Sequence, residues 1–418
     1  MFYIRHKSFT KRFASVYIIL ILLLFTFLGG AFFGYRGGKQ AQVTPQDNGG
    51  KILNKEQQPP YLLENVDFNL FWEVWSMMKD KYLEQPIADT RLFYGALAGL
   101  VASVGDPYTA FLDPETTGKF NSELAGTFDG IGAEIGIKKD QLLVVAPLPG
   151  TPAEKAGLRP GDRILAIDSK DTTGMAIDYA VSIIRGQKGT GVVLKMWREG
   201  WEQAKDITVT RETIHIDSVT WKMLDNNIAQ IKLVQFNGET TAKFETAVQE
   251  ILLKNPKGII LDMRSNPGGY FDSALAVASF WIPAPQPVVI QKTKGNRQQK
   301  FPSFNRASLK NMPTVVLVNN GTASGAEIVA GALQDYGKAK LVGEKTFGKG
   351  SVQDYAGLNG GSSIKITVAE WLTPKERHIN KEGIAPDIEI KLTKEDYEND
   401  KDPQLDKAKE ILMSGNQP

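Results

Sequence analysis

Cysteine is absent from the 418 residues, and histidine occurs only three times, at His6, His215 and His378. Without cysteine, the chain forms no disulfide, iron–sulfur cluster, thiolate metal site or cysteine nucleophile. With only three histidines, a multi-histidine metal centre or a catalytic triad built on histidine is not expected. We therefore expect no metal and no cofactor, and any hydrolytic chemistry has to use another base.

Acidic side chains are missing from the first forty residues, which carry six basic ones. The whole chain has 49 Lys and Arg, so residues 41–418 retain 43 basic side chains against 47 acidic ones, a net charge of −4. The overall charge of +2 therefore originates at the N-terminus. The remainder shows no basic stripe of the kind that binds nucleic acid.

A segment of 23 residues without charge, 13–35, follows four of these basic side chains. At about 1.5 Å per residue, it is long enough to span a hydrocarbon core of roughly 30 Å. A cleavable signal peptide is the alternative, but its apolar part is usually about 7–15 residues and ends in small side chains, whereas this run ends in Phe32, Phe33 and Tyr35. We favour a retained signal anchor in the cytoplasmic membrane, with the N-terminus cytoplasmic and everything after it outside.

Residues 36–60 are rich in Gly, Gln, Asn, Lys and Pro and are interpreted as a flexible linker. A helical region is expected over residues 61–117, because apolar side chains recur there at helical spacing in two stripes, 68–78 and 93–104. We interpret the second stripe as internal core. The first is more aromatic, and part of it is predicted to contact a second copy of the chain in a homodimer.

Short strands separated by turns are expected over residues 118–213. Apolar runs at 133–137, 142–146 and 164–167 alternate with the turn sequences PGTP and RPGD. A short helix at 152–156 ends before Gly157, a usual C-terminal residue.

The turn Gly130-Ile131-Gly132 and the pattern A-x-x-A-G-L-x-x-G-D-x-I-L-x-I over residues 153–167 make this segment resemble a PDZ domain. Free N–H groups of a glycine turn can hold a peptide carboxylate, while the next strand pairs with the extended peptide. The resemblance implies that this turn binds substrate tails. Arg185 is a candidate link from this domain to the rest of the chain, and a plain surface arginine is the equally weighted alternative.

Two strand–turn–helix units are expected within an α/β region over residues 214–392. The apolar runs KGIILDM and PTVVLVN predict buried parallel strands, each followed by a turn and a helix. Sites in such sheets form at the carboxyl ends of the strands. Ser324 lies there, at a helix N-terminus that favours developing negative charge, although a simple N-cap is the commoner role of such a serine.

Three segments, D-M-R-S-N-P-G-G at 262–269, T-A-S-G-A-E at 322–327 and T-F-G-K-G-S-V-Q at 346–353, resemble the C-terminal processing peptidases. These are serine proteases with a Ser–Lys dyad on a crotonase-like or Clp-protease-like α/β fold with an inserted PDZ domain. By position, the resemblance implies Ser324 as nucleophile, Lys349 as general base, Gln353 as the group that orients the lysine, and Gly325, Gly268 and Gly269 as oxyanion donors. One departure is Glu376, where the family usually has glycine.

Elimination also favours lysine, because neither histidine of the folded region lies near a glycine-rich turn. An ordinary lysine, with a pKa of about 10.4, is only about 0.1% neutral near pH 7.5, so Lys349 has to be desolvated. We expect an endopeptidase that binds C-terminal tails of loosely structured proteins and cleaves through an acyl-enzyme. The alternatives are a catalytically silent, membrane-tethered PDZ scaffold and an acyl-CoA enzyme. Residues 393–418 are expected to form a solvated helix or a disordered extension.

Overall fold

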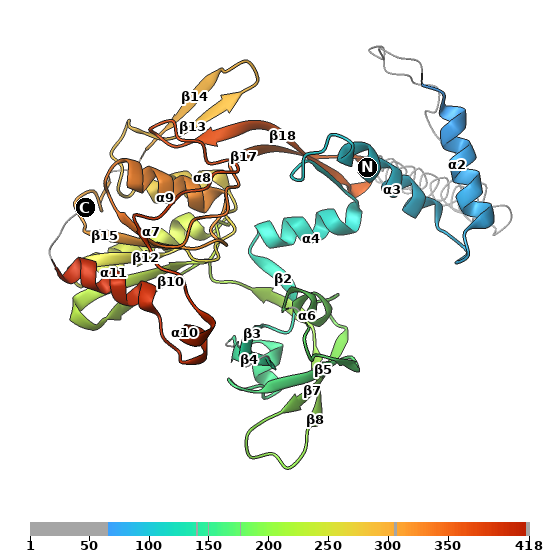
Figure 1. Ribbon diagram of the computed structural model, residues 1–418, viewed down its shortest axis with the longest axis horizontal. Helices are drawn as coiled ribbons and strands as arrows, with labels where there is room; N and C mark the ends of the chain where they lie inside the picture. Colours follow the sequence, from blue (N-terminus) through green and yellow to red (C-terminus); the bar gives the residue numbers. More distant parts are fainter. Residues whose placement is uncertain (1–65, 139–140, 149, 176, 305–306, 415–418) are drawn as a thin grey trace, which may run out of the picture. The chain divides into compact units, whose positions relative to one another are not determined.

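The computed structural model describes residues 66–138, 141–148, 150–175, 177–304 and 307–414 (Figure 1). The chain divides into two compact units after Leu83. The described part of the first unit contains the helix α2 (Phe68–Lys81), whose N-cap Asp67 accepts a hydrogen bond from the Asn69 N–H at 2.9 Å. The expected span at 13–35 and the linker lie outside the described residues. Within those residues, no helix has the length and apolar character needed to cross a membrane.

The second unit begins with helix α3 (Asp89–Ala102), which confirms the second expected helix but not its burial. Phe93 and Leu100 are 52% and 67% exposed, so the interpretation of this stripe as internal core was wrong. The helix packs on the short strand β1 (Ala110–Leu112), and part of its apolar stripe remains exposed. A contact of α2 with a second copy of the chain remains a prediction, which sedimentation velocity tests.

A six-stranded sheet forms the centre of the second unit, in the order β10-β11-β12-β15-β16-β19. Its first pair is antiparallel and the others are parallel. The strands are β10 (Val219–Leu224), β11 (Ile228–Leu233), β12 (Gly258–Asp262), β15 (Thr314–Val318), β16 (Lys340–Gly343) and β19 (Ile388–Glu389). β12 and β15 are buried throughout, as their unbroken apolar sequences predict.

Helices lie on both faces of this sheet. α7 (Thr240–Leu252), α8 (Phe271–Ala278) and α9 (Gly325–Asp335) contribute to the larger apolar core, whereas α11 (Pro403–Met413) contributes to a smaller one with the other face. The expected helices after β12 and β15 are therefore confirmed as α8 and α9. Short 3₁₀ helices, η1 (Asp225–Asn227) and η2 (Asn359–Gly361), precede β11 and β18.

A second sheet adjoins the first through an aromatic cluster. It consists of β1, β13 (Pro287–Thr293), β14 (Gln298–Pro302), β17 (Ser351–Gly357) and β18 (Ser363–Leu372). Phe271, at the start of α8, stacks on Trp371 of β18 with 4.7 Å between ring centroids and an interplanar angle of 3°. Phe301 of β14 meets Phe271 edge to face. These contacts pack the second sheet against α8. Because β17 pairs with β18 and follows Lys349, they also fix the strand next to the expected general base.

The segment expected to be PDZ-like forms its own sheet and core. α4 (Pro114–Leu124) leads into it, so the expected boundary at residue 118 falls inside a helix. The ribbon β2 (Thr127–Gly130) and β9 (Glu212–His215) connects it to the central part. Its sheet contains β3 (Ala133–Lys138), β4 (Gln141–Pro147), β5 (Arg163–Ile167), β6 (Lys170–Asp171), β7 (Gly191–Trp197) and β8 (Lys205–Thr210), with helices α5 (Pro152–Lys155) and α6 (Ile177–Ile184). The three expected strands and the short helix are confirmed.

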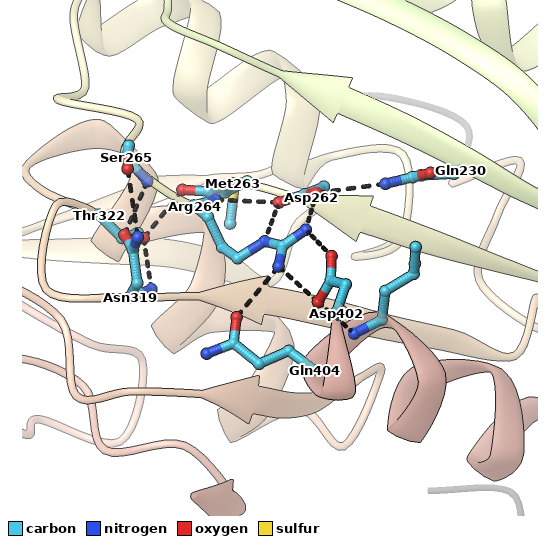
Figure 2. A network of polar contacts seen from close by, with 10 residues as sticks. Gln230, Asp262, Met263, Arg264, Ser265, Asn319, Thr322, Asp402 and Gln404 are labelled. Carbon is cyan, nitrogen blue, oxygen red and sulfur yellow. Dashed lines mark hydrogen bonds and ion pairs between the residues drawn. The ribbon is translucent and has the colours of Figure 1, made fainter. Parts of the chain in front are cut away.

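The C-terminal segment is not a solvated tail. α10 (Lys394–Glu398) is followed by α11, where Gln404 and Ala408 are fully buried. Figure 2 shows Arg264, two residues after β12, between Asp262 and Asp402, with guanidinium-to-carboxylate distances of 2.7 and 2.9 Å. These two carboxylates raise the pKa of Arg264 against the opposing effect of its burial. The expectation of a solvated tail was wrong. One face of α11 packs its apolar side chains against the central sheet, and Asp402 at its N-terminus pairs with Arg264.

Candidate active site

Ser324 occupies a tight turn between β15 and α9. Its φ of 54° and ψ of −119° place it in a region that residues other than glycine rarely adopt. The turn is held against the segment after β12, because the Ala323 N–H donates to the Asn266 carbonyl at 2.9 Å and the Thr322 hydroxyl donates to the Met263 carbonyl at 2.8 Å. Ser324 is thus fixed at a helix N-terminus, at the carboxyl end of a strand, as its sequence position predicts.

Glu327 holds this turn and the lysine loop together. Its side chain is fully buried, and its two oxygens accept hydrogen bonds from the N–H groups of Ser324, Gly348 and Lys349 at 2.7–2.9 Å and from the Thr346 hydroxyl at 2.5 Å. Burial raises the pKa of Glu327, while the four donors act in the opposite direction. One carboxylate therefore connects the candidate nucleophile to the candidate base.

Sequence reasoning did not assign a role to Glu327. It stands three residues after the helix-starting serine, the spacing of a capping box, in which the glutamate accepts from the N-cap N–H. That signal was available within the segment T-A-S-G-A-E. Its second function, binding three donors 19 to 22 residues further along the chain, depends on tertiary structure.

Lys349 lies between two glycines that the backbone path requires. Gly348 has a φ of 88°, and a Cβ on Gly350 would overlap the backbone of Asn380. The Lys349 amine lies 5.5 Å from the centre of the Tyr108 ring. Burial lowers the pKa of this amine, the positive charge of Lys365 lowers it further, and Glu327 opposes the change. The desolvation expected for a lysine base is therefore present.

Ser324 and Lys349 line one cavity of about 740 Å³. Gln353, Gly268, Gly269 and Arg185 line it as well, so the structure brings most of the predicted site residues together. Aromatic rings form much of the remaining wall, namely those of Tyr108, Phe120, Phe128, Phe236, Tyr270, Phe271 and Tyr355. A smaller cavity of about 140 Å³ adjoins Ser324. Its lining is mixed, with the apolar side chains of Ile328, Val352 and Trp371 beside the polar ones of Ser351 and Gln353.

The glycine turn contains one N–H group that already has a partner. The Gly268 N–H donates to the Asn266 side chain at 2.9 Å, so its role as an oxyanion donor remains a prediction. Gly268 also allows close approach, because a Cβ there would lie 2.7 Å from the Ser324 Cβ. The Gly325 N–H is the first of helix α9, a position without a carbonyl partner in the helix. Gly325 and Gly269 remain candidates.

Gln353 contacts other partners than the one expected. Its amide donates to the Ser351 hydroxyl at 2.7 Å and to the Thr367 hydroxyl at 3.4 Å. The β-bulge between Val352 and Gln353 turns this side chain within β17. An orienting contact with the Lys349 amine is therefore still a prediction.

The PDZ residues lie in two places. Ile131 is buried, and its carbonyl and that of Gly132 accept N–H groups from Ala153 and Leu148 at 2.8 Å. The Gly130-Ile131-Gly132 turn is not among the residues that line the catalytic cavity, so its carboxylate-binding role remains a prediction.

Arg185 does reach that cavity. Its guanidinium lies 3.2 Å from Glu123 of α4 and 4.5 Å from the centre of the Phe128 ring. Both partners lie at the connection between the PDZ segment and the central part. These contacts place Arg185 at this connection, and its role as a link remains a prediction.

Glu376 forms a tight turn at the position where the sequence departs from the family pattern. Its φ of 62° is the left-handed conformation that favours glycine, the residue usual at this position in the family that the sequence resembles. The Glu376 N–H donates to the Thr373 carbonyl at 2.8 Å, and Arg377 pairs with Asp335 at 2.5 Å. The substitution therefore adds local strain without opening the loop.

Replacement of Glu327 by glutamine is expected to lower kcat at least about tenfold with little change in the far-ultraviolet circular dichroism spectrum. The amide nitrogen cannot accept, so buried N–H groups on the serine turn or the lysine loop lose their partner. Peptide hydrolysis by purified protein measures the effect. Glu382→Gln, an exposed change in a neighbouring loop, is the control. A Glu327→Gln enzyme with unchanged kcat would contradict the role of this carboxylate.

The activity is expected to rise with pH as the Lys349 amine loses its proton, at a pH below that of an ordinary lysine. Lys365→Gln removes a positive neighbour, so the pKa of Lys349 increases and the acid limb of the kcat/KM profile moves to higher pH. The exposed Lys340→Gln is the control and should leave the limb in place. A limb that stays fixed or moves to lower pH in Lys365→Gln would show that Lys349 is not the titrating group.

Comparison with known proteins identifies the family of the chain. The sequence pattern of Peptidase family S41 matches residues 227–390, and that of a PDZ domain matches residues 143–198. Carboxy-terminal processing protease CtpA of Bacillus subtilis is 38% identical over 326 residues, which cover 78% of this chain and 69% of CtpA. The carboxyl-terminal-processing protease of Synechocystis is 36% identical over 415 residues, which cover 97% of this chain and 94% of that protein.

Among solved structures, the photosystem II D1 C-terminal processing protease has a TM-score of 0.51 and 28% sequence identity, covering 83% of this chain and 92% of its own. An S41 protease from Bacteroides fragilis, at 18% identity and a TM-score of 0.57, shares the fold. Identity above 30% over nearly the whole length of a relative, together with the two domain matches, settles the family. The chain belongs to the carboxy-terminal processing proteases, serine-type peptidases of family S41 that carry a PDZ domain.

Proposed function

We propose that this peptidase is a membrane-anchored endopeptidase that captures the C-terminal tails of loosely structured proteins on its PDZ domain and hydrolyses them with a Ser324–Lys349 dyad. One observation carries the proposal. A serine in a strained turn and a lysine with a lowered pKa line the same cavity, and a single buried glutamate binds the backbone of both.

The chemistry follows from these residues. The neutral Lys349 amine takes the Ser324 hydroxyl proton as the oxygen attacks the peptide carbonyl. The N–H groups of Gly325 and Gly269 stabilise the negative oxygen of the tetrahedral intermediate. The ammonium then protonates the leaving amine, which leaves an acyl-enzyme. Water, deprotonated by the same amine, attacks the ester and releases the second product.

The cavities support a peptide as substrate. The large cavity has the size of ordinary ligand sites and aromatic walls that can contact an extended chain. The small one beside Ser324 has room for one substrate side chain next to the cleaved bond. Glycine-turn recognition by the PDZ domain would hold the free carboxylate of the same chain.

Anchoring is proposed from the sequence alone, since residues 13–35 combine the length of a span with four preceding positive charges. It places the catalytic part outside the cytoplasm. Retention of the full-length protein in membranes after alkaline carbonate extraction is expected. Release into the soluble fraction, or mature protein starting beyond residue 35, would favour a cleaved signal peptide instead.

Ser324→Ala and Lys349→Ala are each expected to abolish cleavage of an unstructured protein with a free C-terminus while the protein stays folded. The first removes the nucleophile and the second removes its base. Lys345→Ala, an exposed lysine on the same loop, is the matched control and should retain wild-type turnover. Substantial proteolysis by purified Lys349→Ala would eliminate the dyad. Absence of cleavage by the wild type, with tails still bound, would support the silent scaffold.

Arg185→Ala is expected to lower turnover of long tail-bearing substrates more than that of short peptides, because it removes the contacts to Glu123 and Phe128 at the connection to the PDZ domain. Lys188→Ala, an exposed cation three residues later, is the control. Equal losses for long and short substrates would mean that Arg185 shapes the cavity without linking the domains.

A further inference from the structure

Two carboxamide side chains that the mechanism does not use lie beside the catalytic cavity. Asn237 is fully buried and its Oδ1 accepts from the Glu239 N–H at 3.0 Å, but its Nδ2 has no acceptor among the described residues. The Nε2 of Gln235 is also buried without an acceptor in that part of the chain, and Gln235 lines the cavity. Buried donors of this kind are disfavoured, so their position requires a reason.

Both amides face Gly126, where the chain passes from α4 to β2 and into the PDZ domain. Gly126 has a φ of 79°, and a Cβ on it would overlap Asn237 Nδ2 and lie 3.1 Å from Gln235 Nε2. The Gly126 carbonyl accepts the N–H of Ile216 at 2.9 Å, just after the chain leaves the domain through β9. The two ends of the insert therefore meet at one glycine, which is packed on Asn237.

The opposite side of the same loop contacts the glycine turn of the active site. The Phe236 N–H donates to the Gly268 carbonyl at 2.9 Å, and the Tyr270 N–H donates to the Phe236 carbonyl at 2.7 Å. A Cβ on Gly269 would overlap that carbonyl. Phe236 is 1% exposed, so the loop has little freedom to move without moving the turn.

We infer that residues 235–237, here named the hinge loop, position the oxyanion turn at Gly269, and that the packing of Asn237 against Gly126 fixes the place of this loop. The inference deepens the proposed function and rests on it, because it takes Gly269 as an oxyanion donor. Asn237 and Phe236 are positioning residues.

Gly126→Ala tests the contact directly. We expect kcat on a tail-bearing substrate to fall at least tenfold with KM changed less than threefold, because the added methyl displaces Asn237 and with it the turn. The affinity of the PDZ domain for a peptide with a free C-terminus, measured by fluorescence anisotropy in the Ser324→Ala chain, should not change. Gly105→Ala is the matched control, since its φ of 74° is equally left-handed and no atom lies within 4 Å of the added carbon. It should retain kcat within twofold.

A compensating variant distinguishes an effect of the Gly126–Asn237 contact from a general loss of folding. Asn237→Ser shortens the side chain that the new methyl meets, so the double variant Gly126→Ala with Asn237→Ser is expected to recover kcat relative to Gly126→Ala alone. If the losses of the two single changes multiply instead, the two residues do not act through their contact and the inference is overturned.

Hydrogen exchange gives a readout that needs no catalysis. In the Ser324→Ala chain without peptide, Gly126→Ala should alter deuterium uptake over residues 266–271, whereas Gly105→Ala should not. Unchanged uptake at the turn in Gly126→Ala would overturn the inference even if the protein is an active protease. An altered turn in a chain that cleaves nothing would preserve the coupling and reject the proposed function.

Discussion

A carboxylate without access to solvent holds the catalytic segments in place. Glu327 binds the first turn of α9 on one side and the loop of Lys349 on the other, and four donors compensate for removing its charge from water. Because both segments share this one acceptor, the serine and the lysine are placed by the same interaction. The strained backbone at Ser324 persists for the same reason, since the surrounding bonds leave it no relaxed alternative.

Burial at the site acts on two groups in opposite ways. It raises the pKa of Glu327 and lowers that of Lys349, so each neutral form becomes easier to reach. For Glu327, the hydrogen bonds counter the effect, whereas for Lys349 the neighbouring Lys365 reinforces it. In the proposed mechanism, this lowered pKa allows Lys349 to act as the base without a histidine.

Much of the fold was predictable because local patterns determine it. The unbroken apolar runs of β12 and β15 and the short motifs around Ser324 and Lys349 indicate buried strands and the turns that follow them. Tertiary contacts decided the rest. The periodicity of the sequence does not reveal three features: the exposure of Phe93 and Leu100 on α3, the docking of α11 through Arg264 and Asp402, and the hydrogen bond that engages the Gly268 N–H.

The meeting of Gly126 and Ile216 also determines how the inserted domain is attached. A domain whose two ends are joined by a hydrogen bond of 2.9 Å occupies the place of a single surface loop in the host fold. The chain therefore enters and leaves this domain at one place, and that place is packed against Asn237 and Gln235 of the central part. Any change in the orientation of the inserted domain begins at this contact.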